Sequence, residues 1–179
     1  MNELTNKDKY ESIKNKYLSN IPVDVIALAE ELGIDVYEVF FDNDNVSGYI
    51  STEDNKPFIC VNKRHPSTRQ YFTIAHEIGH FVLHQDILDN NITVPTYYKT
   101  GEGINNCVMA RSSIEFTNSI EYKRNETQAN QFAANLLMPK DEFIKQANLC
   151  DNLIDLAQIF KVSVGAASIR ANSLGIEFF

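Results

Sequence analysis

The stretch TIAHEIGHFVLH, residues 73–84, decides how this chain folds and what chemistry it can carry. It holds three of the four histidines in the chain, His76, His80 and His84, at intervals of four residues. Residues four apart lie on one face of an α-helix, separated by about 40° and a rise of about 6 Å. Because apolar residues fill most of the other positions, we expect a largely buried helix that starts near Pro66 and runs to His84.

The first two histidines belong to an H-E-x-x-H pattern, His76-Glu77-Ile78-Gly79-His80. Two imidazoles at this spacing can converge on one metal ion with bonds of about 2.0–2.1 Å. Glu77 lies about 100° round the helix from His76, so its carboxylate can reach a water on the ion without binding the metal. The pentapeptide also occurs by chance in surface helices. A buried polar group needs a partner, however, so the apolar setting favours a metal site with Glu77 as the catalytic residue.

A catalytic zinc site usually takes three protein ligands and leaves the fourth position to water. His84 is a poor third ligand, because it lies eight residues after His76, a rise of about 12 Å along a straight helix. We interpret His84 as a helix-end residue that the negative end of the helix dipole favours. A contact of His84 with a ligand residue or with substrate is the alternative.

Glu126 is the better third ligand. It begins the run ETQANQFAANLLMP, whose apolar stripe includes the small residues Ala129 and Ala133. Glu126 and Asn130 fall on the same stripe, and an inward carboxylate is costly unless it is paired or bound to a metal. Asn130 could accept a hydrogen bond from the free N–H of a ligating histidine. The alternative is that Glu126 only complements the dipole in the first turn of a helix.

The order of elements predicts an α+β fold. Helical patterns cover residues 5–19 and IPVDVIALAEELG; IDVYEVFF is a strand, and VSGYIS and PFICVN form a hairpin beside the H-E-x-x-H helix. The hairpin is either purely structural or an open edge for an extended peptide. We place one domain at 1–139, with a long loop at 85–125, and a helical appendage at 140–179.

The long loop at 85–125 is rich in Asn, Gly, Pro and Thr, which is typical of a lid or binding loop. A peptidase also needs a hydrogen-bond donor to the developing oxyanion. Candidates in or near this loop are Tyr97, Tyr98, Arg111 and Tyr122. Cys107 also lies there; it is either a solvated free thiol or a latch on the open metal position.

Composition narrows the function classes. The net charge of −8 argues against direct nucleic-acid binding and against an anionic membrane surface. No apolar run approaches the length of a membrane span, and no signal sequence is recognisable, so we expect a cytoplasmic protein. Three scattered cysteines fit a reducing compartment. The stretch LIDLAQIFKVSVGAASIRANSLG has a helix-turn-helix cadence, but its second half offers little positive charge, which favours a structural or partner-docking role.

The motifs HEIGHFVLH and NETQANQFAANLLMP together resemble the ImmA/IrrE family of zinc metallopeptidases. The resemblance covers about residues 20–175. It implies a zincin-like metallopeptidase core with one zinc ion, held as in gluzincins by His76, His80 and Glu126, with Glu77 as the catalytic glutamate. Family members cut helix-turn-helix repressors of mobile elements, phages or stress regulons and so act as anti-repressors.

The resemblance therefore predicts a zinc-dependent endopeptidase whose partner is a helix-turn-helix repressor. The alternative is a non-proteolytic regulator that binds a repressor or antitoxin, with a structural or vestigial zinc site. The presence of Glu77 favours catalysis, because a structural zinc site does not need it.

Overall fold

The computed structural model describes residues 4–84, 96–97 and 120–178. Within these residues the fold is α+β, as the sequence predicts, and none of the helices is long and apolar enough to cross a membrane. The elements in chain order are α1 (Asn6–Leu18), α2 (Val25–Glu31), β1 (Asp35–Val39), β2 (Val46–Glu53), β3 (Lys56–Asn62), α3 (Ser67–Leu83), β4 (Thr96–Tyr97), α6 (Ile120–Leu137), α7 (Lys140–Ala147), α8 (Leu153–Ile159) and α9 (Val164–Ser173).

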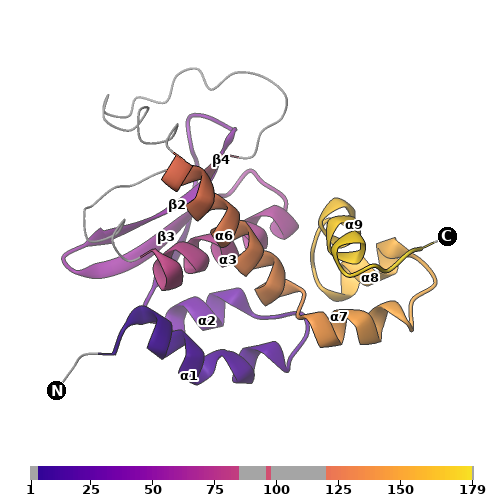
Figure 1. Ribbon diagram of the computed structural model, residues 1–179. Helices are drawn as coiled ribbons and strands as arrows, with labels where there is room; N and C mark the ends of the chain where they lie inside the picture. Colours follow the sequence, from indigo (N-terminus) through magenta and orange to yellow (C-terminus); the bar gives the residue numbers. More distant parts are fainter. Residues whose placement is uncertain (1–3, 85–95, 98–119, 179) are drawn as a thin grey trace.

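The sheet has the strand order β1-β3-β2-β4 (Figure 1). The predicted hairpin is confirmed: β2 and β3 are antiparallel, and their register runs from Gly48 opposite Val61 to Glu53 opposite Lys56. The turn between them is Asp54-Asn55, with φ of 49° and 63°, the left-handed pair that a tight two-residue hairpin requires.

Beyond the hairpin, the sheet as a whole is mixed. β1 pairs with β3 in parallel, from Asp35 opposite Phe58 to Val39 opposite Asn62. β1 and β2 lie on opposite sides of β3, and β1 runs in the opposite direction to β2. The short strand β4 pairs antiparallel with β2 at its outer edge.

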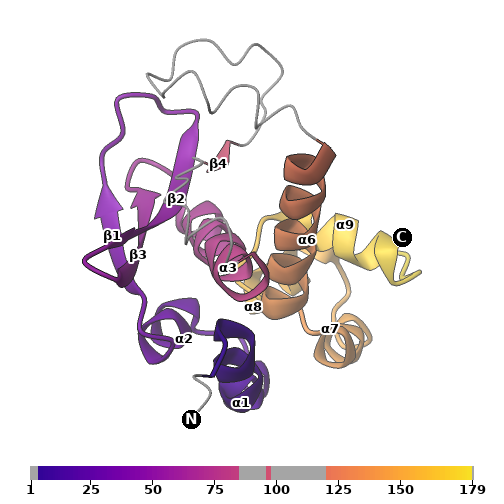
Figure 2. The same ribbon diagram turned by 60° about the vertical axis from the view of Figure 1, so that its left-hand side comes forward.

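α3 is the central element of the molecule. Figure 2 shows it between the sheet and α6, with α1 and α2 beneath it, and each of these elements contacts it. Its apolar side chains belong to one continuous core with the strands and with the C-terminal helices. Ile78 is fully buried in this core, together with Ile59 from β3 and Leu136 from α6. The H-E-x-x-H helix is therefore packed against the sheet, α6, α1 and α2, and it is largely buried from Thr73 to Val82, as its apolar surroundings predicted.

The C-terminal segment is helical, as expected, and consists of α7, α8 and α9. Pro139 closes α6 and at once begins α7, because a proline at a helix start costs no hydrogen bond. The helix-turn-helix cadence corresponds to α8 and α9, which contact each other. Phe143 of α7 and Phe160 after α8 are fully buried, with ring centroids 5.2 Å apart, in the same core as α3. The division into 1–139 and 140–179 stays a prediction.

Two parts of the predicted long loop at 85–125 have regular secondary structure. Thr96–Tyr97 is strand β4, and residues 120–125 form the first turns of α6. Residues 120–125, IEYKRN, include good helix formers and contain neither Gly nor Pro, so the helix extends through them. The rest of the predicted loop, residues 85–95 and 98–119, lies outside the described residues.

Candidate metal centre

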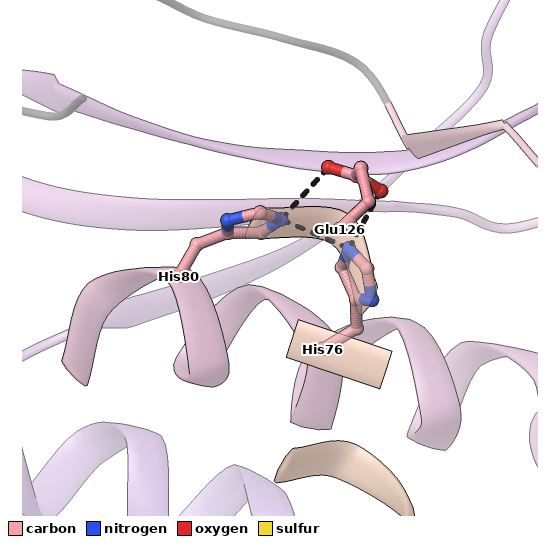
Figure 3. Close-up of side chains that lie close together, drawn as sticks. All are labelled: His76, His80 and Glu126. Atoms are coloured by element: carbon pink, nitrogen blue, oxygen red, sulfur yellow. Dashed lines mark hydrogen bonds and ion pairs between the residues drawn. The ribbon is translucent and has the colours of Figure 1, made fainter. Parts of the chain in front are cut away.

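α3 places His76 and His80 one turn apart on the side that faces α6 (Figure 3). Both imidazoles are buried, with 0% and 8% of their surface exposed. Their ring centroids lie 4.7 Å apart, and the two Nε2 atoms approach to 3.0 Å. The i, i+4 spacing that the sequence showed therefore brings two ring nitrogens to one point.

Gly79 allows α6 to approach this face of α3. A Cβ at Gly79 would lie 3.2 Å from the Cα of Ala129 and 3.1 Å from Cδ1 of Phe132. Such distances are tighter than ordinary carbon contacts, so any side chain here would push the two helices apart. The small residues Gly79 and Ala129 thus set the distance at which α6 presents its polar side chains to the histidines.

Glu126 comes from α6 to the same point as the two histidines. Its Oε2 lies 3.4 Å from His76 Nε2, and its Oε1 lies 3.1 Å from His80 Nε2. Figure 3 shows the carboxylate over the two rings, which come from the other helix. Its side chain is 23% exposed, so the group opens towards solvent on the carboxylate side.

The three residues fit a metal ion. One ligand atom from each of His76, His80 and Glu126 lies within 4.8 Å of the other two, the one such group among the described residues. A tetrahedral ion with bonds of about 2.0–2.1 Å keeps its ligand atoms about 3.4 Å apart. The observed separations of 3.0, 3.1 and 3.4 Å are close to that value. Three lone-pair atoms at this distance repel one another unless a metal ion or a proton lies between them.

The electrostatics of the group point the same way. Burial by itself raises the pKa of Glu126, but hydrogen bonds and charge from His76 and His80 outweigh it and bring this pKa down to about 2. For His76, burial lowers the pKa, and the hydrogen bond and charge of Glu126, with the charge of Glu77, raise it above its usual value. The site therefore holds a carboxylate anion and attracts positive charge to the imidazoles.

Asn130 holds the ring of His76 from α6. Its Oδ1 lies 3.0 Å from His76 Nδ1 and can only accept, so this nitrogen carries the proton. In the neutral ring, Nε2 then keeps its lone pair for the metal position. The predicted role of Asn130 as an acceptor for a ligating histidine is confirmed, but the residue is exposed and does not point into the core as expected.

Glu77 is buried beside the group, with 1% of its surface exposed. It is not one of the converging ligands, and its negative charge acts on His76, whose pKa it raises. A buried carboxylate next to two buried imidazoles is expensive without positive charge nearby. Its place agrees with a role beside the ion, and its catalytic function stays a prediction.

His84 ends α3, as expected, and the alternative reading, a contact of His84 with a ligand residue, is the one that the structure shows. The residue is buried, and burial lowers its pKa. Its Nδ1 lies 3.1 Å from His80 Nδ1, and its Nε2 lies 2.9 Å from Gln128 Oε1. Sequence reasoning missed Gln128, because its partner across the helix interface depends on how α6 is rotated against α3.

The candidates for oxyanion stabilisation remain open. Tyr98 and Arg111 lie outside the described residues, as does Cys107 with its latch hypothesis. Tyr97 belongs to β4 and Tyr122 to the first turns of α6.

The structure combines an α+β fold with two histidines and a glutamate, from two helices, that could hold a metal ion. The chain belongs to the Peptidase M78 family, described as the IrrE N-terminal-like domain, whose model matches residues 29–172. This confirms the resemblance to the ImmA/IrrE family that the two motifs carry. Members of such a family are zincin-like proteases or related regulators.

Among solved structures, a Mycobacterium tuberculosis transcriptional regulator is similar in fold, with a TM-score of 0.59 and 16% sequence identity. The similarity covers 92% of this chain and 47% of that one, so the chain spans about half the length of the regulator. At this identity the match concerns the fold alone. A comparison with curated proteins found no match.

Proposed function

We propose that the chain is a zinc-dependent endopeptidase that cleaves a protein partner, with His76, His80 and Glu126 as the zinc ligands. The observation that carries the proposal is the convergence of three lone-pair atoms at 3.0–3.4 Å with a buried Glu77 beside them. Two histidines and one carboxylate from the protein are a usual ligand set of catalytic zinc, and they leave one position for water.

The roles of the residues follow from where they lie. When bound, zinc supplies a Lewis acid that polarises the peptide carbonyl and lowers the pKa of water. Glu77 takes the proton of the attacking water as its oxygen joins the carbonyl carbon. It then gives that proton to the leaving amine nitrogen as the carbon–nitrogen bond breaks. Asn130 keeps the ring of His76 in place throughout.

A groove beside the metal group suits a protein substrate. It has a volume of about 1050 Å³ and lies between the first half of α3, α6 and α9. Its apolar lining includes Phe72, Ala134 and Ile169, and Asn130, the partner of His76, is also part of its wall. Apolar side chains of a folded partner can fill such a groove while a neighbouring peptide segment reaches the zinc.

We propose a helix-turn-helix repressor of a mobile element, phage or stress regulon as the substrate, which would make the protein an anti-repressor. The family resemblance supports this choice. A direct role in DNA binding is less favoured: Arg170, the basic residue of α9, donates from Nε and Nη2 to the carbonyl of Met138, at 3.1 and 2.9 Å. It is therefore used inside the molecule instead of facing a nucleic acid.

The test needs a candidate substrate: a helix-turn-helix repressor from the same genome, sought first among the genes next to this one. Glu77→Gln keeps the shape of the side chain and removes the base, so it should bind zinc normally and cleave about 10²–10⁴-fold more slowly. Glu30→Gln, an exposed acid on α2, is the matched control and should cleave like the wild type. If the wild type relieved repression without cutting, and Glu77→Gln did so equally well, the non-proteolytic regulator would be the correct function.

A further inference from the structure

A chain of polar contacts leads from His80 back to α6. His80 Nδ1 lies 3.1 Å from His84 Nδ1, and their ring centroids are 5.2 Å apart. On its other side, His84 Nε2 lies 2.9 Å from Gln128 Oε1. His84 is only 8% exposed, so water does not compete freely for these contacts. Nothing in the proposed reaction so far uses His84 or Gln128.

The protons along this chain can be placed by counting donors. Gln128 contributes its amide oxygen, which only accepts, so Nε2 of His84 must carry a hydrogen. A neutral imidazole with a hydrogen on Nε2 has its lone pair on Nδ1. The facing Nδ1 of His80 is then the donor of the 3.1 Å contact. In a neutral His80 the lone pair consequently lies on Nε2, the atom 3.1 Å from Glu126 Oε1.

We infer that His84 is a positioning residue for the metal centre: it accepts the Nδ1–H of His80 and holds that ring in the tautomer that presents Nε2 to the ion, while Gln128 holds His84. The inference rests on the proposed zinc site. It makes the two ligating rings equivalent, since each donates its Nδ1–H to an acceptor. His76 donates directly to Asn130 of α6, and His80 donates to an interposed ring that is itself bound to Gln128 of α6.

In this arrangement, α6 contributes a contact to each of the three histidines of α3. α6 supplies Glu126 to the metal position, Gln128 to His84 and Asn130 to His76. Partners of this kind orient a ligand and raise its basicity, and their loss typically costs about 10–100-fold in metal affinity. Because His84 contributes no ligand atom, its removal should weaken zinc binding without changing the number of ions bound.

Zinc dissociation constants from chelator competition test the inference. His84→Ala should bind zinc about 10–100-fold more weakly than the wild type and still take up one ion at saturation. His84→Asn keeps an acceptor oxygen near the place of Nδ1 and should recover most of the affinity. Leu83→Ala, the neighbouring and 41% exposed residue at the same helix end, is the matched control and should bind like the wild type. If the role of His84 were purely structural, both His84 variants would have a lower melting temperature in the metal-free protein. His84→Asn would then bind zinc no more tightly than His84→Ala.

A second measurement needs no variant. Long-range proton–nitrogen NMR spectra of the zinc-loaded wild type should show His80 with a protonated Nδ1 and a metal-bound Nε2. Binding through Nδ1, or unchanged zinc affinity in His84→Ala, would overturn the inference and leave the proposed zinc site standing. A wild type that binds no zinc would overturn both.

Discussion

His76 Nε2 and His80 Nε2 lie 3.0 Å apart in the protein interior, one turn from each other on α3. Asn130 Oδ1 accepts a hydrogen bond from Nδ1–H of His76. In the neutral ring, the lone pair of His76 is therefore on Nε2, the atom that faces His80. A carboxylate oxygen of Glu126 completes the group at 3.1 Å from His80. Two packed helices thus direct polar side chains to one point, where bound positive charge stabilises them.

Gly79→Ala tests whether the approach of α6 builds the site. The new Cβ would lie 3.2 Å from the Cα of Ala129, so we expect the helices to separate, at a cost of about 1–3 kcal/mol in the free energy of unfolding. Zinc affinity should also fall, because a shift of α6 moves Glu126 away from His76 and His80. Denaturant unfolding and chelator competition measure the two effects.

Gly165→Ala is the control for this substitution. Its Cβ would meet only Ser163 Oγ, at 3.9 Å, so the space is open. An alanine in α9 should therefore leave zinc binding unchanged and stabilise the helix by about 0.5–1 kcal/mol. Equal stability losses in the two variants would show that the contact of Gly79 with Ala129 is not what matters.

Asn130→Ala should lower zinc affinity by about 10–100-fold, because the Nδ1–H of His76 loses its acceptor. Asn130→Asp keeps an oxygen at that place and should bind zinc more tightly than Asn130→Ala. The adjacent, exposed Gln131→Ala is the control and should titrate like the wild type. If Asn130→Ala and Gln131→Ala gave the same dissociation constant, the hydrogen bond would have no part in orienting His76.

Ile169→Asp tests the groove. Its side chain is 72% exposed on α9 and lines the groove, so the change costs little folding free energy but places a charge where an apolar partner would lie. Losing one such apolar contact is worth about 1.5–3 kcal/mol, so KM for the repressor should rise about ten- to a hundredfold with zinc content unchanged.

Ile154→Asp is the matched control for the groove. Ile154 is 56% exposed on α8 and is not part of the groove lining. Its KM should equal that of the wild type. If both aspartate variants bound the repressor normally, the partner would dock elsewhere on the molecule.

The sequence predicted most of the metal group because the residues that form it follow helical spacing. His76 and His80 are four apart, and Glu126 shares a stripe with Ala129, so each helix could be read by itself. Asn130 followed from the same stripe. The hairpin was equally local, since β2 and β3 are joined by two residues.

What the sequence missed depends on how separate elements meet. The contact of His84 with Gln128 requires the rotation of α6 about α3, which no spacing within either helix reveals. The parallel pairing of β1 with β3 likewise depends on the side of β3 that β1 takes. The start of α6 at Ile120 was read as loop, because propensity alone marks the ends of elements poorly.

Zinc content of protein prepared without chelator decides whether His76, His80 and Glu126 are ligands. We expect about one zinc per chain in the wild type, the number that a single three-ligand site holds, and a sharp loss in His76→Ala, His80→Ala and Glu126→Ala. Glu77→Gln, which removes no ligand, should keep its zinc. A wild type without zinc, or a Glu126→Ala variant that holds as much zinc as the wild type, would contradict this assignment.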